Sequence, residues 1–245
     1  MNTQDAALAP AVGEKRPTAV AVIVPAKDEQ ERIADTVRAA AALPEVDLVV
    51  VVDDGSRDAT SALARDAGAL VVRHKQNQGK AAAMETGARL VAMREAVAET
   101  PARALLFIDA DMGESAAGAA PLIESVLTDG VDMAIAILPP QPGASGMGVV
   151  VRTARRGIEK ATGYVAKQPL SGTRCMTRET WEACLPLAPG WGVETSLTID
   201  ALRAGYVLRE VPCQLSHRPS GRDLRGQLHR LGQLKDVCRA LLRKR

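Results

Sequence analysis

Apolar residues in the first half of the chain gather in short runs, which polar and amphipathic segments separate. The runs are continuous and rich in β-branched residues, so we expect strands that are buried on both faces. They cover residues 18–26, 46–54, 102–111 and 131–138, with a shorter strand at 69–74. The segments between them have helical spacing, and within 28–43 Ile33, Val37 and Ala40 share one face. Strands that alternate with helices, without hairpin signals, predict an α/β fold with a mostly parallel central sheet flanked by helices.

The same patterns predict the remaining elements. We expect helices within 55–68, 77–97, 149–164, 190–206 and 224–245, a helix that opens near Thr177, and a late strand within 207–223. In the first of these helices Asp58 is expected as the N-cap and Gly68 as the C-terminal stop. The last helix sets leucines at near-helical spacing opposite a strongly basic face. By default it packs on the domain; the alternatives are a dimer contact or contact with an acidic membrane surface.

The composition is that of one large domain with an aliphatic core. Of the 245 residues, 47% are hydrophobic and only 2% are aromatic, so Ala, Val, Leu and Ile make up most of the core. The formal net charge is +2, which argues against nucleic acid as the main partner.

The cysteines and the N-terminus bear on location. No CxxC pair occurs, so a structural zinc site is not expected. The cysteines are Cys175, Cys184, Cys213 and Cys238. We recognise no signal peptide, and no apolar run approaches the roughly 20 residues that span a bilayer. We therefore expect a cytoplasmic protein with reduced thiols, with peripheral contact at the inner face of the membrane as an alternative.

Polar residues follow three of the predicted strands. PAKDE comes at the end of the first, DDGS at the end of the second, and DAD at the end of the strand over 102–111. In a parallel sheet, ligands gather at the carboxyl ends of the strands. The last of these strands runs through DAD to residue 111, so its alternation puts Asp109 and Asp111 on one side. Two like charges so close imply that a positive group lies between them or that both face open water.

Four motifs resemble a known family. VAVIVPAKDEQERI, VVVVDDGSRDAT, NQGKAAAMETG and LLFIDAD have the order and spacing of family 2 type glycosyltransferases with the GT-A fold, over residues 18–137. QPLSG, GWGVET and SHRPSGRD are more loosely similar to glucosyl-3-phosphoglycerate synthases and mannosylglycerate synthase-like enzymes. The chain is shorter than those enzymes, so polyprenyl-phosphate sugar transferases and bacterial accessory glycosyltransferases stay open as alternatives.

The resemblance implies a metal-dependent hexosyltransferase. Its donor would be a UDP- or GDP-linked sugar, and its acceptor a small hydroxylated molecule, phosphorylated or not, or a polyprenyl phosphate. The metal would be Mg²⁺ or Mn²⁺, which acts as a Lewis acid at the diphosphate. By the family pattern Asp111 binds the metal, Asp109 binds it indirectly or holds the ribose, and His217 is a further ligand. A histidine ligand would favour Mn²⁺.

The resemblance also implies the other site residues. Nucleotide-sugar binding falls to Pro25, Asp28, Glu29, Asp54, Lys80, Asp109 and Ala110. Asp28 stands where family members often have Asn, and we expect a structural, turn-capping role for Asp53. Acceptor binding falls to Ser171, Gly172, Trp191, Arg218 and Arg222. The catalytic candidates are Asp111 and Glu194, the latter as a contact to sugar or acceptor hydroxyls or as a base.

These assignments divide the chain into four segments. Residues 1–17 form a disordered leader, 18–137 the nucleotide-sugar half of one GT-A domain, 138–223 the acceptor half and 224–245 the basic helix. Two other functions compete with transfer. A nucleotidyltransferase would carry a glycine-rich phosphate loop after the first strand, and VPAKDEQE is not one. A non-catalytic nucleotide-binding scaffold would not need the carboxylates Asp109 and Asp111.

Overall fold

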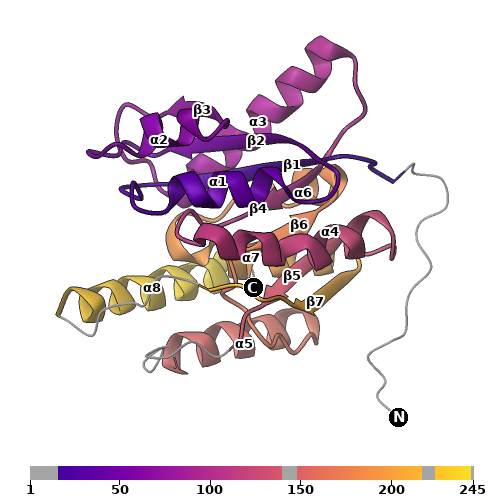
Figure 1. The fold of residues 1–245 in the computed structure, drawn as a ribbon. Coiled ribbons are helices and arrows are strands. Elements are labelled where there is room, and N and C mark those ends of the chain that lie inside the picture. Colours follow the sequence, from indigo (N-terminus) through magenta and orange to yellow (C-terminus); the bar gives the residue numbers. More distant parts are fainter. Residues whose placement is uncertain (1–15, 140–147, 217–223, 244–245) are drawn as a thin grey trace.

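The computed structural model of the chain describes residues 16–139, 148–216 and 224–243. Within these residues one sheet lies between two layers of helices (Figure 1). Its strands are β1 (Val20–Ala26), β2 (Val46–Asp53), β3 (Leu70–Arg73), β4 (Ala104–Phe107), β5 (Met133–Ile137), β6 (Arg174–Met176) and β7 (Leu208–Pro212). The helices are α1 (Ile33–Ala41), α2 (Thr60–Asp66), α3 (Lys80–Ala98), α4 (Ala120–Leu127), α5 (Gly148–Thr162), α6 (Arg178–Ala183), α7 (Val193–Arg203) and α8 (Leu224–Arg243), with 3-10 turns η1 (Gly113–Ala119) and η2 (Gly190–Gly192).

The strand order is β3-β2-β1-β4-β6-β5-β7. β1 pairs in parallel with β2 and with β4, and β2 pairs in parallel with β3. β6 lies between β4 and β5, and it alone of these strands runs antiparallel to both of its neighbours. The prediction of a mostly parallel α/β sheet flanked by helices is therefore confirmed, with one antiparallel insertion that the sequence pattern did not indicate.

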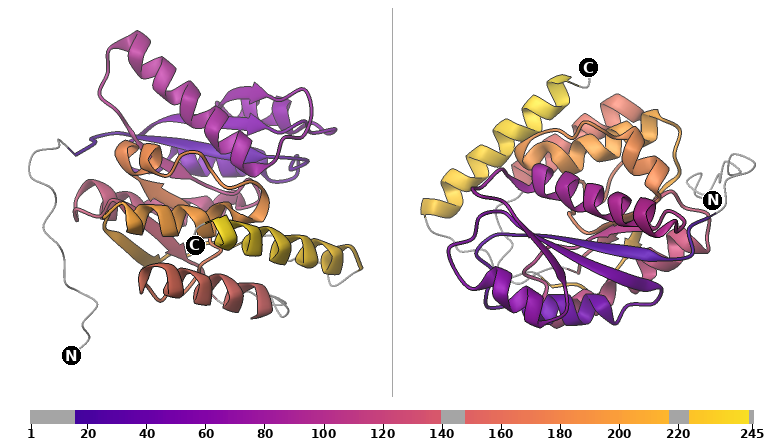
Figure 2. Two further views of the ribbon diagram at one scale, coloured as in Figure 1. Left: turned by 180° about the vertical axis from the view of Figure 1, so that it is seen from behind. Right: turned by 90° about the horizontal axis from the view of Figure 1, so that it is seen from above.

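The uninterrupted apolar strands are explained by burial on both faces. Along β1, Val22 packs into one hydrophobic cluster with α1, α2, η1 and α4, while its neighbour Ile23 packs into another with α3, α6 and α7. Both side chains are fully buried. The helices of each cluster cover opposite faces of the sheet, as the two views in Figure 2 show.

Three local predictions need correction. Helix α1 begins at Ile33, several residues after Asp28, because the backbone over that stretch is a series of turns. Asp58 is not the N-cap of α2; that position is Ala59, and the Asp58 carboxylate instead accepts the Thr60 backbone N–H from just outside the helix. Strand β4 ends at Phe107, so the alternation argument for the two aspartates after it was wrong.

Other local predictions are confirmed. Gly68 follows α2 with a φ of +100°, a conformation that few other residues adopt. Thr177 is the N-cap of α6, and its side chain accepts a hydrogen bond from the Thr180 N–H. Much of the N-terminal leader lies outside the described residues.

Helix α8 packs on the domain, as the default expectation had it. It contacts α5, α7 and η2, and Val237 and Ala240 are buried in that contact. Figure 2 shows the helix running along the flank of the molecule beside α5 and α7. Among the described helices, none combines the length and apolar character that a membrane crossing needs.

Candidate functional site

A cavity of about 560 Å³ opens at the carboxyl ends of β1, β2 and β4. Ten of the residues expected in the site line it: Pro25, Glu29, Asp54, Lys80, Asp109, Ala110, Asp111, Gly172, Trp191 and Glu194. The polar side chains that followed separate strands in the sequence therefore face one hollow, as expected for a parallel sheet.

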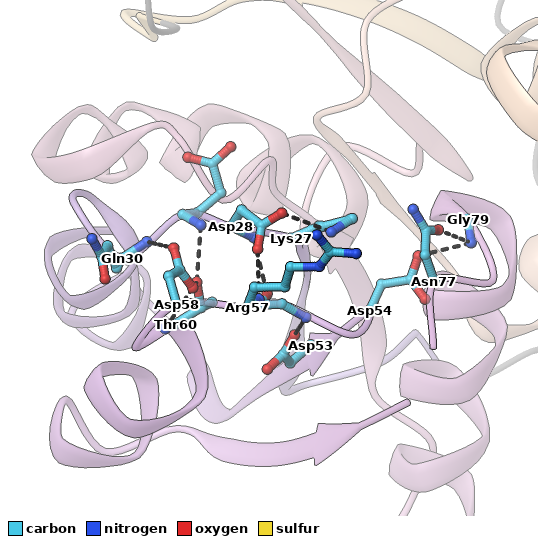
Figure 3. A network of polar contacts seen from close by, with 12 residues as sticks. Lys27, Asp28, Gln30, Asp53, Asp54, Arg57, Asp58, Thr60, Asn77 and Gly79 are labelled. Atoms are coloured by element: carbon cyan, nitrogen blue, oxygen red, sulfur yellow. Dashed lines mark hydrogen bonds and ion pairs between the residues drawn. The ribbon is translucent and has the colours of Figure 1, made fainter. Parts of the chain in front are cut away.

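The Asp54 carboxylate, directly after β2, is one fixed point of the cavity. Its Oδ1 accepts the Gln78 N–H at 2.7 Å. Its Oδ2 accepts the Gly79 N–H at 2.7 Å (Figure 3). Gly79 has a φ of +91°, which turns its N–H toward the carboxylate just before α3 begins. The His74 Nδ1 lies 2.8 Å from Oδ1 and contributes a third contact.

Asp53, one residue earlier, has the structural role expected of it. Its Oδ1 accepts the Ser56 N–H at 2.7 Å, and its Oδ2 accepts the Ser61 hydroxyl. The Arg73 guanidinium lies 3.5 Å from the same carboxylate. Burial disfavours the charged form, but these hydrogen bonds and the Arg73 charge outweigh it and hold the pKa of Asp53 below its usual value.

Lys80, at the first turn of α3, links the two halves of the site. Its ammonium lies 2.7 Å from Asp109 Oδ1 and 3.0 Å from Glu194 Oε1. Burial opposes the charged form of this group, yet the two carboxylates outweigh burial and raise the pKa of Lys80 above its ordinary value. The lysine therefore supplies positive charge beside Asp109 and Glu194.

Gly172 lies directly against the ion pair of Lys80 and Asp109. A Cβ built at Gly172 would lie 2.4 Å from Lys80 Nζ and 2.8 Å from both carboxylate oxygens of Asp109. No side chain fits there without displacing the ion pair. The φ of Gly172 is outside the left-handed range, so it is the lack of space for a side chain, and not the backbone conformation, that requires glycine here.

Two expected residues lie beside the cavity without lining it. Asp28 has a φ of +55° and pairs with Lys27 Nζ at 2.7 Å and with the Arg57 N–H at 2.7 Å (Figure 3). The Lys27 hydrogen bond, followed by that from Arg57, lowers the pKa of Asp28. Ser171 is buried beneath the acceptor side, next to the lining residue Gly172.

One part of the cavity lining is largely apolar and includes residues that sequence reasoning missed. Val150 of α5, Leu170, and Gln233 and Val237 of α8 line the cavity together with Trp191. Trp191 keeps 40% of its surface exposed, and its backbone N–H donates to the Asp236 carboxylate of α8 at 3.3 Å. The apolar spacing of the last helix predicted a packed face, but nothing in the pattern showed that this face reaches the site.

The expected metal ligands are described only in part. Asp109 and Asp111 both line the cavity, whereas His217 lies outside the described residues. Arg218 and Arg222, expected as acceptor contacts, lie outside them as well. Within the described part of the chain, no three His, Cys, Asp or Glu side chains gather as a ready metal site.

Comparison with known proteins gives a family match. The family model of glycosyl transferase family 2 matches residues 21–146, which hold β1 to β5 and the motifs around Asp54, Lys80 and Asp109.

Two curated relatives are similar over most of the chain. Glycosyltransferase AglJ of Haloferax volcanii is 32% identical over 84% of this chain and 66% of its own length. Glucosyl-3-phosphoglycerate synthase of Mycolicibacterium paratuberculosis is 29% identical over 74% of this chain and 59% of its own length. The chain thus spans about two thirds or less of the length of these two relatives.

Solved structures of glucosyl-3-phosphoglycerate synthase from Mycobacterium tuberculosis are similar in fold. The complex with Mg²⁺ and UDP has a TM-score of 0.72 at 28% identity, covering 93% of this chain and 79% of the other. The complex with Mn²⁺, UDP and phosphoglyceric acid has a TM-score of 0.71 at 27% identity, covering 93% and 78%.

Proposed function

The chain belongs to glycosyl transferase family 2, and from this premise we propose that it transfers a hexose from a UDP- or GDP-linked donor to a small hydroxylated acceptor with a divalent metal. The observation that carries the proposal is the convergence of Asp54, Lys80, Asp109, Asp111 and Glu194 on one cavity at the carboxyl edge of the sheet. These residues come from four separate segments of the chain, and a purely structural role would not require them to meet.

The donor set suits Mg²⁺ or Mn²⁺. Both ions prefer oxygen ligands, and Asp109 and Asp111 bring two carboxylates to the cavity, where Mg²⁺ commonly takes its remaining ligands from water and substrate phosphates. The bound metal would neutralise charge on the departing diphosphate as the glycosidic bond breaks. Solved relatives that contain UDP with Mg²⁺ or with Mn²⁺ support this assignment.

The chain's own residues divide the remaining work. Asp54 holds the nucleoside, and its carboxylate is fixed in advance by backbone N–H groups. Lys80 keeps the Glu194 carboxylate, which is only 5% exposed, turned toward the cavity. Glu194 then accepts hydrogen bonds from hydroxyl groups of the sugar or of the acceptor. A hydrogen bond to the attacking hydroxyl orients its oxygen and directs its proton toward the Glu194 carboxylate.

For the acceptor we propose a small phosphorylated molecule first. The relative from Mycobacterium tuberculosis has been solved with phosphoglyceric acid, and this chain is similar to it over 93% of its length. Arg218 and Arg222 are the proposed phosphate contacts.

A polyprenyl phosphate is the second candidate acceptor. It is favoured by the apolar wall that Val150, Leu170, Trp191 and Val237 give the cavity. This wall would accept the first part of a lipid chain at the cavity mouth, and α8 would then meet the membrane surface.

Ligand-dependent thermal stability tests the proposal. UDP, GDP and their hexose conjugates are added with Mn²⁺ or with chelator to the wild-type protein and to Asp111→Ala. Asp35→Ala serves as the matched control, because Asp35 pairs only with Arg38 on the exposed face of α1. At 100 times its dissociation constant a nucleotide stabilises the fold by about 2.7 kcal/mol, which raises the Tm measurably.

We expect one nucleotide to raise the Tm of the wild type and of Asp35→Ala only with Mn²⁺, and no rise in Asp111→Ala. Transfer is then assayed with that donor against 3-phosphoglycerate and a short polyprenyl phosphate, which separates the two acceptor candidates. A wild-type protein that responds to none of the nucleotides would contradict the proposed function.

A further inference from the structure

We propose that His74 is a positioning residue for nucleobase recognition: it fixes the Asp54 carboxylate so that one remaining acceptor site faces the base. This inference rests on the proposed function, because it concerns the same donor nucleotide. His74 was not expected in the site from the sequence, and it does not line the cavity itself. Its effect is therefore exerted through Asp54.

Three of the acceptor positions of the Asp54 carboxylate are used by the described residues. A carboxylate has about four such positions. On Oδ1, Gln78 N–H at 2.7 Å and His74 Nδ1 at 2.8 Å take two. On Oδ2, Gly79 N–H at 2.7 Å takes one. Asp54 lines the cavity, so the proposal assigns the fourth position, on Oδ2, to the base of the donor nucleotide.

His74 is held firmly enough to act as a clamp. It follows β3, and its backbone N–H donates to the Asp53 carbonyl at 2.8 Å, which continues the ladder between β2 and β3. Its ring is only 8% exposed and lies between Asp54 and Thr86 of α3, with Nε2 3.0 Å from the Thr86 hydroxyl. Because a carboxylate can only accept, Nδ1 is the donor in the contact with Asp54, and the second contact at Nε2 fixes the ring orientation.

This geometry requires a hydrogen-bond donor on the base. Asp54 can only accept at its open position. The ring N–H of uracil at N3 and that of guanine at N1 are such donors, and methylation of either nitrogen removes the donor. The proposed contact therefore suits a uracil or a guanine nucleotide.

Calorimetric titration with paired ligands tests the role of His74. UDP and N3-methyl-UDP, or GDP and N1-methyl-GDP, are titrated with Mn²⁺ into the wild type, His74→Ala and His74→Asn. Asn is the conservative variant because its amide nitrogen reaches the position of Nδ1. In the wild type we expect the methylated ligand to bind at least about tenfold more weakly, the value of one hydrogen bond to a charged group.

In His74→Ala we expect the unmethylated nucleotide to bind about tenfold more weakly and the methylation penalty to fall below about threefold, because the carboxylate loses its third hydrogen bond and only the two backbone N–H groups still hold it. His74→Asn should restore most of the penalty. In turnover assays the donor KM should rise in His74→Ala while kcat changes by less than about threefold, a split that general loss of folding would not produce.

Each outcome bears on one conclusion. If the wild type binds the nucleotide and His74→Ala keeps the full methylation penalty, the role of His74 is overturned and the proposed function stands. If the wild type binds neither nucleotide, both fail. Should His74→Ala not fold, Thr86→Val provides the test, because it removes only the partner of Nε2 and should halve the penalty or more; an unchanged penalty there contradicts the inference.

Discussion

Replacement of Gly172 by Ala should disable the site while leaving the fold nearly intact. The new Cβ would lie 2.4 Å from Lys80 Nζ, whereas ordinary contact begins at 3.4 Å. The ammonium must therefore move by about 1 Å from its place between Asp109 and Glu194. The Asp109 oxygens, at 2.8 Å from the same Cβ, must move as well.

The cost to activity and the cost to stability should differ widely. A misplacement of about 1 Å in a catalytic arrangement costs on the order of 100-fold in rate. The clash, however, is with the far end of a flexible lysine and not with backbone, and a partly exposed ion pair contributes about 1 kcal/mol at most. A protein of this length should then lose only about 2–4 °C in Tm.

Steady-state kinetics with the donor that the ligand-dependent melts select, together with a thermal melt of each variant, measure both quantities. Gly232→Ala is the matched control, since the same methyl group on α8 meets no atom within 4 Å. We expect kcat/KM to fall about 100-fold in Gly172→Ala and to be unchanged in Gly232→Ala. A Gly172→Ala enzyme that keeps its kcat/KM within threefold would refute the reasoning, because Lys80 would then have no required position.

Three further predictions concern separate parts of the molecule. Asp53→Asn should lower the free energy of unfolding by about 1–3 kcal/mol at pH 7, because buried donors lose their charged acceptor. Since hydrogen bonds hold the pKa of Asp53 below its usual value, its contribution is present above pH about 4 and is lost as the pH falls further, so urea titrations at pH 7 and pH 3 should give a smaller difference at pH 3. Gly118→Ala should lower the free energy of unfolding by about 1–3 kcal/mol in the same titrations, because its Cβ would lie 2.4 Å from the Gln214 carbonyl oxygen. A variant as stable as the wild type would show that the backbone at Gln214 moves away from η1 at no cost. Glu194→Gln should reduce kcat about 100-fold or more while the nucleotide dissociation constant stays within about threefold in calorimetry, and a parallel loss of nucleotide affinity would contradict its assignment to hydroxyl contacts.

The donor side of the site could be predicted from the sequence because its signals are local. Asp54 and Asp109 each follow an apolar run, and the parallel sheet implied by the alternation of strands and helices brings such ends to one edge. His74 carries a similar signal, since it directly follows the strand that pairs with β2. A histidine and an aspartate at the ends of neighbouring parallel strands are within reach of each other, and this pairing was overlooked.

The antiparallel strand β6 could not be predicted in the same way. It has three residues, Arg174–Met176, too few for a periodicity to show its direction or partners. Its place between β4 and β5 is decided by non-local packing after the excursion through α5. The aspartates after β4 show a related limit, because the apolar pattern continues through Ile108 although the ladder stops at Phe107.

The glycines of GWGVET have a packing role that the sequence did not indicate, because both lie against α8. A Cβ at Gly190 would meet the Asp236 carboxylate at 2.1 Å, and one at Gly192 would meet the Ala240 side chain at 2.7 Å. Because neither glycine has a side chain, α8 approaches η2 closely enough for the backbone N–H of Trp191 to reach Asp236.

This close approach has a consequence for specificity. It brings Gln233 and Val237 onto the cavity, so the last helix supplies part of its wall. The family match ends at residue 146, and the lining residues from Val150 onward lie beyond it. If the proposed function is right, nucleotide recognition and acceptor choice depend on separate parts of the chain, and we expect changes in α8 to alter the acceptor without disturbing Asp54 or Lys80.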